Sequence, residues 1–500
     1  MIYTVASTLP PVHGGRTKSL LNRINFLDDE FDFEQTILTT NYNPNYNSVY
    51  KIFYDKKILK ENIKIINLYD WLSGFQLLTK PSKSFLFINK SNNKIQNIKI
   101  SNYIIEKDSD NNCERYYDKD TGKYLLYRKF YSDSNIVKFE DYFVQGVKHK
   151  VERWEYNEEG YLHRITNYSR KLNKKLAEFF YDLKERLYCK KYYEETNDNK
   201  LIGIFIYSNG TLVESFNNEK DLFTYFFDFN FSDQDIIFND ARLLDKSLIN
   251  STKKIKPILV FHSSHFEGEN IKGSYKLALN NPDKIAKYYV LTNHQKEDIQ
   301  NDFNIPDEKF KVIPHFINAP KDIINDKKDQ FVFMGRFSEE KQISHIIESY
   351  KLYKEKGYKT KLVLYGGVKG EERTKIENLI EKYNLKNEVT IQEFTNNPAQ
   401  VFRESKASLL TSKFEGFPLS IMESINEGCP VIAYDIRYGP REIIVNGENG
   451  YLIEPNNIEQ FAEAMISISE SPLENVKTKE GITYQAAINN FDSLIKTVTS

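Results

Sequence analysis

Cysteine is scarce in this chain, and long apolar runs are absent from it. Only three cysteines occur in 500 residues, at Cys113, Cys189 and Cys429. This wide spacing predicts neither a disulfide framework nor a metal site, and it is typical of reduced thiols in a cytosolic protein. No apolar run reaches about 18 residues, so we expect no transmembrane helix. The opening MIYTVASTLPPVHGG lacks the basic flank and apolar centre of a signal peptide, so we expect a cytoplasmic protein.

Net charge is nearly absent as well. The chain has 69 Lys and Arg against 70 Asp and Glu, a balance of −1. Without a global basic field, we expect no nucleic-acid partner. Neither GxxxxGK[ST] nor GxGxxG occurs, which excludes those two phosphate-binding signatures. The 34 tyrosines and 34 phenylalanines instead indicate a substantial β component.

The length and the rhythm of the sequence predict several domains with an α/β fold. Five hundred residues exceed one hydrophobic core, and strand and helix patterns alternate at both ends of the chain. We expect two Rossmann-like domains that face a cleft, the first of them interrupted by a β-rich antiparallel insert. The expected segments are 1–76 and 218–318 for the N-terminal, acceptor-side domain, 77–217 for the insert, 319–480 for the C-terminal domain, and 481–500 for a helix with the option of crossing back to the first domain.

Three phrases in the middle of the chain echo one another. Tyr116–Tyr124, Trp154–Leu162 and Phe180–Leu187 each place a turn rich in charged residues between aromatic or leucine residues. Acidic and glycine turn residues between alternating aromatics indicate β-hairpins. A sheet of such hairpins has open edges, which self-association often covers. We therefore expect a homo-oligomer, and a monomeric decoration is the alternative.

The stretch Ala407–Asp435 reads as strand, tight loop, short helix and strand. Pro418 suits the first helical position, and Gly428 ends the helix. Such a unit forces parallel strands with the helix packed on one face. Its loop then lies at the carboxyl ends of the strands, beside a helix N-terminus, where α/β sheets bind ligands and free N–H groups attract phosphate.

Four charged residues gather around this loop. Glu415 and Glu423 are separated by seven residues, and Arg336 and Lys341 follow the strand Gln330–Gly335. Two cations at a strand end can neutralise a diphosphate leaving group. Glu423 can accept the hydroxyls of a ribose, and Glu415 would lie near a transferred sugar. The alternative interpretation is a solvated face for the acids and a capped helix start for the cations.

Two histidines and a glycine pair complete the candidates. His262 and His265 follow a strand, so either can hydrogen-bond a sugar hydroxyl or move a proton, although a structural role is the alternative. Gly14 and Gly15 precede a helix and permit close approach of a phosphate or sugar, but they also fit an ordinary turn. The histidines lack a third partner for a metal, and we expect none.

The residues from Arg336 to Lys341, followed by EGFPLSIMES with Glu415 and Glu423, resemble the retaining glycosyltransferases of the GT-B fold in the large family numbered four. GGRTKSLLNR fits the first glycine loop of that family. The phrase SKFEGFPLSIMESINEGCPVIAYDIRYGPREIIVNGENGYLIE and the β insert resemble a narrower group, the teichoic-acid α-glycosyltransferases of Gram-positive bacteria. Relatives of that group glycosylate serine-rich adhesins.

The resemblance implies a role for each matching residue. Arg336 and Lys341 would hold the diphosphate of a UDP-sugar in place of a metal, and His262 or His265 would be the histidine of the cleft. Glu423 would hold the ribose and Glu415 the sugar hydroxyls. The remaining donor contacts would come from Gly14, Gly15, Phe394, Gly416, Phe417, Pro418, Leu419 and Ser420.

The resemblance also implies a function. It is retaining transfer of glucose, or N-acetylglucosamine, from a UDP-sugar to a polyol-phosphate wall teichoic acid, with glycerol-phosphate favoured. The alternatives are a protein O-glycosyltransferase acting on serine-rich adhesins and an inactive module that binds cell-wall polymer. The expected partners are the donor and the anionic polymer, without a cofactor. The insert would form the oligomer, with a trimer as one option, and the inner face of the membrane is one option for the location.

Overall fold

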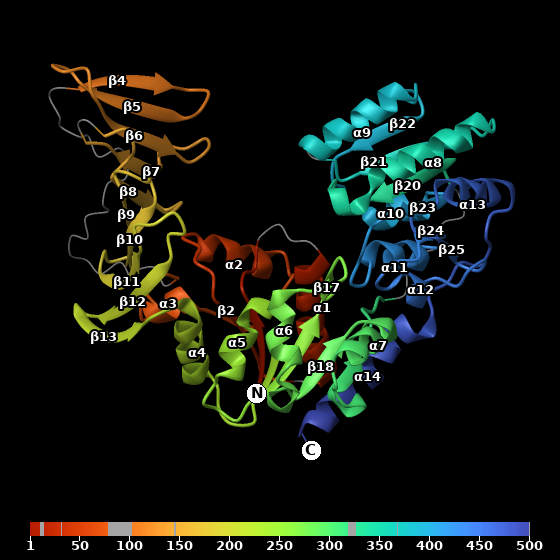
Figure 1. The fold of residues 1–500 in the computed structure, drawn as a ribbon, viewed down its shortest axis with the longest axis horizontal. Helices are drawn as coiled ribbons and strands as arrows, with labels where there is room; N and C mark the ends of the chain where they lie inside the picture. The colour runs from red at the N-terminus through yellow and green to blue at the C-terminus, as the bar shows by residue number, and fades with distance from the viewer. Residues whose placement is uncertain are drawn as a thin grey trace. The chain divides into compact units, whose positions relative to one another are not determined.

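The computed structural model describes residues 1–10, 15–31, 33–78, 103–144, 147–318, 327–367 and 369–499 (Figure 1). The chain divides into two compact units, Met1–Ile255 and Lys256–Ser500. No helix within the described ranges is long and apolar enough to cross a membrane. This division reflects only how compactly the backbone packs, and it does not test the domain boundaries expected from the sequence. Those boundaries stay predictions.

The first unit contains parallel strands in the order β14-β1-β2-β3. They are β1 (Ile2–Ala6), β2 (Gln35–Thr39), β3 (Lys64–Asn67) and β14 (Ile236–Asn239). The helices around them are α1 (Gly15–Phe31), α2 (Tyr46–Asp55), α3 (Leu68–Leu72), α4 (Glu219–Asn230) and α5 (Asp245–Ile249). Every residue of β1 and β2 is buried, as expected for parallel strands covered on both faces.

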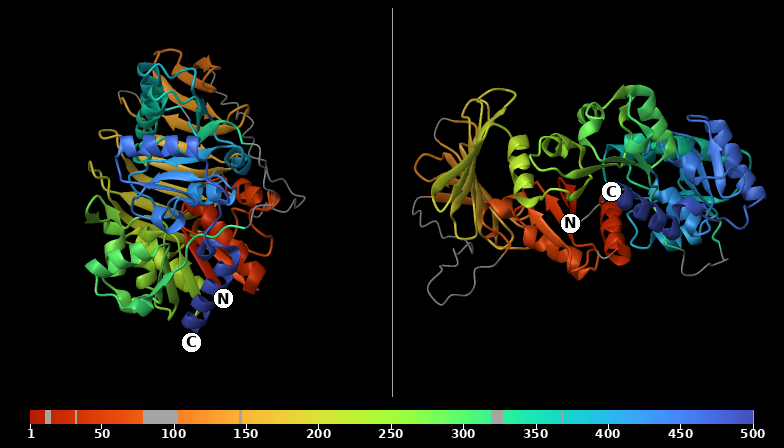
Figure 2. Two further views of the ribbon diagram at one scale, coloured as in Figure 1. Left: turned by 90° about the vertical axis from the view of Figure 1, so that its right-hand side faces the viewer. Right: turned by 90° about the horizontal axis from the view of Figure 1, so that it is seen from below.

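The predicted β-rich antiparallel insert is confirmed. Among the described residues, ten strands pair in strict sequence order as one meander, and Figure 2 shows them as a continuous twisted layer. The strands are β4 (Tyr103–Asp108), β5 (Cys113–Asp118), β6 (Tyr124–Phe130), β7 (Val137–Tyr142), β8 (Glu152–Tyr156), β9 (Leu162–Tyr168), β10 (Lys175–Tyr181), β11 (Leu187–Tyr193), β12 (Leu201–Ser208) and β13 (Thr211–Phe216). Turn residues with positive φ, such as Gly122, Gly160 and Asn209, join the hairpins.

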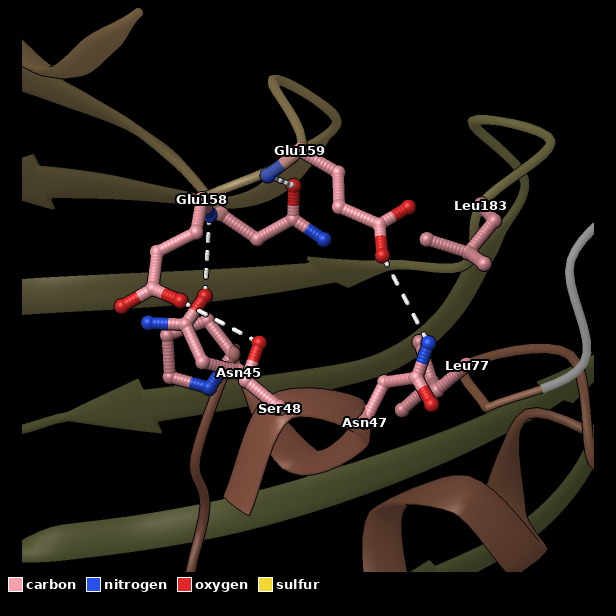
Figure 3. Close-up of a pocket in the computed structure, with 9 residues that line it drawn as sticks. Asn45, Asn47, Ser48, Leu77, Glu158, Glu159 and Leu183 are labelled. Atoms are coloured by element: carbon pink, nitrogen blue, oxygen red, sulfur yellow. Dashed lines mark hydrogen bonds between the residues drawn. The ribbon is translucent and has the colours of Figure 1, made fainter. Parts of the chain in front are cut away.

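A polar junction ties the β8–β9 hairpin tip to the start of α2 (Figure 3). The backbone N–H of Glu158 donates to Asn45 at 2.9 Å, and the Ser48 hydroxyl donates to the Glu158 carboxylate at 3.2 Å. An aromatic contact also joins the two parts, since Tyr42 meets Phe180 of β10 edge-on with ring centroids 4.9 Å apart. The insert is therefore packed against the α/β part of its own unit.

The second unit begins with three parallel strands, β15 (Lys256–Phe261), β18 (Lys287–Val290) and β19 (Phe310–Val312). A small hairpin, β16 (Phe266–Glu267) and β17 (Asn270–Ile271), and helices α6 (Gly273–Leu279) and α7 (Asn293–Asp302) connect them. The last helix, α14 (Tyr484–Thr499), packs on β18, where Phe491 meets Tyr289 at 5.9 Å between ring centroids.

The second unit continues with a parallel sheet in the order β22-β21-β20-β23-β24-β25. Its described strands are β20 (Gln330–Met334), β21 (Lys361–Tyr365), β22 (Val389–Gln392), β23 (Ala407–Leu410), β24 (Val431–Tyr434) and β25 (Gly450–Ile453). The helices are α8 (Ile343–Glu355), α9 (Glu371–Lys382), α10 (Pro398–Arg403), α11 (Leu419–Asn426), α12 (Pro440–Ile443) and α13 (Ile458–Glu470). The strand order reverses between β20 and β23, and such a switch point is where doubly wound sheets bind ligands.

Alternate residues of β20 show that helices cover both faces of this sheet. Phe331 and Phe333 belong to the core that includes α8 and α13, whereas Val332 packs with Phe402 of α10. Side chains along a strand alternate between faces, so the two cores lie on opposite sides. The carboxyl edge of the strands is left for the loops that carry the candidate site.

A buried ion pair joins α1 to the residue that follows β14. Its contribution to the free energy of unfolding can be measured. Both guanidinium Nη atoms of Arg23 donate to Asp240, at 2.9 and 2.6 Å, and both side chains are buried. Asp240→Ala leaves the arginine without this carboxylate, so we expect a loss of about 3–5 kcal/mol in the free energy of unfolding. Urea denaturation followed by circular dichroism measures it.

The control is Glu34→Ala, which removes the exposed partner of Lys64 at 3.6 Å. An exposed pair of this kind contributes about 0–1 kcal/mol. Equal shifts in the two variants would contradict the role given to the buried pair.

Candidate functional site

An ion pair joins the loops that follow β20 and β23. The Lys341 ammonium lies 2.5 Å from Oε1 of Glu415, and the Ser412 hydroxyl donates to the same oxygen at 2.8 Å. Only 18% of the lysine side chain and 16% of the glutamate side chain are exposed, so solvent screens the pair weakly. The structure thus brings together two of the charged residues predicted from the sequence.

The backbone around Lys341 is fixed from the same side. Lys341 ends a 3-10 turn, Glu339–Lys341, and the Thr411 hydroxyl lies 3.0 Å from the Lys341 carbonyl oxygen, to which it donates. Because β20 and β23 are neighbours, the lysine loop and the glutamate loop emerge side by side. The cation is therefore held at the carboxyl edge of the sheet.

Arg336 lies at the same strand end but is held loosely. Its side chain is 74% exposed and its guanidinium is 3.7 Å from Glu340, an ion pair that water screens strongly. The structure does not bring Arg336 into the Lys341–Glu415 pair. Its charge remains available at the loop surface, where it can meet an anion.

The Glu415 loop leads directly into α11. Pro418 is the N-cap of this helix, one residue before the predicted position, because its ψ of 99° is extended rather than helical. The N–H groups of Leu419 and Ser420 fall in the first turn, where the helix itself provides no carbonyl acceptor. Phe417 is buried beneath the loop, and Glu423, half-buried, lies one turn into the helix. The arrangement offers oriented N–H donors to an anion.

Two glycines allow backbones to approach closely around the site. A Cβ atom on Gly416 would lie 2.0 Å from the carbonyl oxygen of His262, so only glycine fits there. A Cβ atom on Gly366 would lie 2.1 Å from the carbonyl oxygen of Gly335, in a residue whose φ is already +105°. Phe394 stands beside this second turn with 58% of its surface exposed. An exposed aromatic face next to a glycine turn can stack on a planar base.

The two histidines predicted from the sequence have different surroundings. His262 follows β15, is half-buried, and lies with its carbonyl oxygen against Gly416. Its ring stacks on His315, with centroids 6.0 Å apart, and His315 meets Phe417 edge-on at 5.6 Å.

His265 is fully buried and lies parallel to Tyr438 at 6.1 Å between ring centroids. Burial lowers the pKa of His265 to about 4, so its ring is neutral at physiological pH. The structure therefore places His262 at the loop surface and His265 in the core behind it.

Sequence reasoning missed three residues of this region, namely His315, Asp298 and Tyr438. Tyr438 is fully buried, and its hydroxyl donates to Asp298 of α7 at 2.7 Å. In the sequence, only position could have indicated a role for these residues. His315 follows a strand, and Tyr438 precedes Gly439 and Pro440 in a turn.

The donor role expected for the glycine pair stays a prediction. Gly14 lies outside the described residues, and Gly15 begins α1 in the first unit. Among the side chains that the structure describes, no group of three or more His, Cys, Asp or Glu is placed to hold a metal ion. The expectation that the site works without a metal stays a prediction.

Comparison with known proteins gives this geometry a family context. Residues 316–487 match the family model described as glycosyl transferases group 1. Over 497 residues the chain is 27% identical to the poly(glycerol-phosphate) alpha-glucosyltransferase of Bacillus subtilis (strain 168), covering 96% of this chain and 71% of that protein. It is 26% identical to the poly(ribitol-phosphate) alpha-N-acetylglucosaminyltransferase of Staphylococcus aureus (strain COL), covering 93% of this chain and 92% of that protein.

A solved structure supports the fold in the same way. The crystal structure of a mutant of S. aureus TarM in complex with fondaparinux, alpha-GlcNAc-glycerol and UDP superposes with a TM-score of 0.81 at 24% identity, covering 100% of this chain and 99% of that chain. The predicted GT-B fold with its antiparallel insert is therefore confirmed. The chain has a GT-B fold, carries a glycosyl transferases group 1 domain over residues 316–487, and is homologous over most of its length to teichoic-acid α-glycosyltransferases.

Proposed function

We propose that the chain transfers glucose from UDP-glucose to hydroxyl groups of a poly(glycerol-phosphate) wall teichoic acid, with retention at the anomeric carbon. N-acetylglucosamine is the second candidate sugar and poly(ribitol-phosphate) the second candidate acceptor. The observation that carries the proposal is the Lys341–Glu415 pair, 2.5 Å apart beside the N-terminus of α11. Similarity over 96% and 93% of this chain to enzymes named for these two polymers supports the acceptor class.

The donor would bind along the carboxyl edge of the six described strands. Lys341 and Arg336 neutralise the diphosphate, assisted by the N–H groups at the start of α11. Glu423 accepts hydrogen bonds from the ribose hydroxyls, and Phe394 stacks on the base. The two cations provide the charge stabilisation for the leaving group, and a metal ion is not required.

Glu415 would hold the sugar that is transferred. Its carboxylate contacts Lys341, so it links the sugar hydroxyls to the group that binds the leaving phosphate. The half-buried His262 lies behind Gly416 and can hydrogen-bond another sugar hydroxyl. We assign the cleft role to His262, because the ring of His265 is fully buried.

Retention would follow from substitution on one face of the sugar. The bond between the anomeric carbon and the phosphate oxygen breaks, and the acceptor oxygen forms its new bond on the same side. The acceptor proton passes to the leaving diphosphate, which Lys341 and Arg336 stabilise as its charge develops. This step balances without a second protein carboxylate as nucleophile.

The decisive experiment supplies UDP-glucose or UDP-N-acetylglucosamine together with one acceptor. The acceptors are purified glycerol-phosphate polymer, ribitol-phosphate polymer and a serine-rich peptide. We expect sugar on the glycerol-phosphate polymer with the α configuration by NMR. Transfer to the peptide alone would favour a protein O-glycosyltransferase, and binding of polymer without any transfer would indicate an inactive module.

Lys341→Ala tests the diphosphate role. We expect transfer to fall by at least about 100-fold, because the main neutralising charge beside the leaving group is lost. Circular dichroism checks the fold, and radiolabelled UDP-sugar measures turnover. Lys413→Ala is the control, since this exposed lysine of the neighbouring Glu415 loop pairs with Glu339 at 2.7 Å. Unchanged turnover in Lys341→Ala would refute the role.

Glu423→Ala tests the ribose contact. Hydrogen bonds to a charged group contribute about 1.5–3 kcal/mol, so UDP affinity should fall by roughly 10- to 100-fold. Isothermal titration calorimetry with UDP measures the change, and Glu381→Ala on the exposed face of α9 is the control. Normal UDP affinity in Glu423→Ala would count against the assignment.

Self-association through the insert is the last part of the proposal, with a trimer as one state. Both edges of the sheet carry exposed apolar residues, among them Ile104 on β4 and Val213 on β13, which are 50% and 54% exposed. Open edges of this kind favour pairing with another chain. We expect sedimentation at micromolar concentration to show an oligomer that Val213→Lys weakens. Leu243→Lys, at another exposed site, is the control. A wild-type monomer would contradict the proposal.

A further inference from the structure

Tyr438 is a buried side chain that contacts both His265 and helix α7 beside the candidate site. Its ring lies parallel to His265, with an interplanar angle of 6°, and His294 of α7 meets it edge-on at 5.1 Å. Its hydroxyl donates to Oδ2 of Asp298 at 2.7 Å. The tyrosine is fully buried, and burial together with this carboxylate raises its pKa well above the usual value. The hydroxyl therefore stays a hydrogen-bond donor throughout the physiological range.

The backbone of the same turn holds Glu415. The Tyr438 N–H donates to the Glu415 carbonyl oxygen at 2.9 Å, and the Glu415 N–H donates to the Arg437 carbonyl oxygen at 2.8 Å. The guanidinium of Arg437 also reaches Asp298, at 3.2 Å. Both residues that hydrogen-bond the Glu415 backbone are thus anchored on one carboxylate of α7.

The turn is fixed at two further points. The Glu442 carboxylate of α12 accepts from the N–H groups of Asn293 and His294, both at 3.1 Å, at the start of α7. A Cβ atom on Gly439 would lie 2.6 Å from the ring of Pro418, which precedes α11. Helix α7, the 437–442 turn and the Glu415 loop therefore form one connected brace.

We propose that Tyr438 and Asp298 are positioning residues that set the place of the Glu415 carboxylate during sugar transfer. The inference rests on the proposed function and goes beyond it by naming groups that do not touch the donor. Lys341 and Ser412 hold the carboxylate from one side, and the brace holds its backbone from the other. Without the brace, the Glu415 loop can move together with the Lys341 side chain. The sugar hydroxyls then lose a carboxylate that is held in a fixed position.

Tyr438→Phe isolates the contact, because it removes one hydroxyl and keeps the stacked ring. We expect kcat to fall about 10-fold, since small misplacements of a group that orients substrate are costly. The KM for the UDP-sugar should stay within about twofold, because Lys341, Arg336 and the α11 N-terminus are untouched. Asp298→Asn keeps an oxygen acceptor and should retain most activity, whereas Asp298→Ala should lose as much as Tyr438→Phe.

The matched control is Tyr353→Phe. Tyr353 is also fully buried, and its hydroxyl lies 2.8 Å from that of Ser469 in the core around α8 and α13. This variant loses a comparable hydrogen bond without affecting the Glu415 loop, so its kcat should equal that of the wild type. A similar loss in Tyr353→Phe, or a wild-type kcat in Tyr438→Phe, would overturn the inference.

Hydrogen exchange provides a readout that does not depend on turnover. The N–H groups of Glu415 and Tyr438 should exchange about 10-fold faster in Tyr438→Phe and at the wild-type rate in Tyr353→Phe. Unchanged exchange at both groups would overturn the brace. A wild-type protein that transfers no sugar would refute the proposed function instead, while the exchange rates would still decide whether the brace exists.

Discussion

The contact between Lys341 and Glu415 depends on one feature of the fold, the adjacency of β20 and β23. These strands are separated by more than seventy residues, yet their carboxyl ends lie side by side because they are parallel neighbours, at the point where the strand order reverses. The pair places a largely buried cation next to a largely buried anion at this edge, a combination that suits phosphate and sugar groups respectively. The donor-binding role that we propose for these two residues rests on this pairing.

Close backbone packing is the second constraint on the site. Gly416 lies against the His262 carbonyl oxygen and Gly366 against the Gly335 carbonyl oxygen, at distances that leave no room for a Cβ atom. Each glycine replaces a side chain with polar backbone that can face a ligand. The site is therefore built from main-chain groups and a few charged side chains, which makes it sensitive to the position of its loops.

The position of the Glu415 loop depends on contacts outside the Lys341–Glu415 pair. The 437–442 turn hydrogen-bonds the Glu415 backbone and is itself fixed on α7 through Asp298 and Glu442. In the first unit, the Glu158 turn of the insert is joined to the start of α2 by one backbone-to-side-chain hydrogen bond and by a bond between side chains. In both places polar groups from separate elements fix the position of a turn.

The sequence by itself determined the element types, the antiparallel insert and the motif that carries Lys341, Glu415 and Glu423. Local periodicity, turn residues and the spacing of two acids are encoded over short distances, so they can be read without a structure. Only the tertiary structure decided that Lys341 pairs with Glu415, that His262 rather than His265 lies at the loop surface, and that Tyr438 braces the loop. Those relations join residues far apart in the chain, and they depend on packing that no local pattern records.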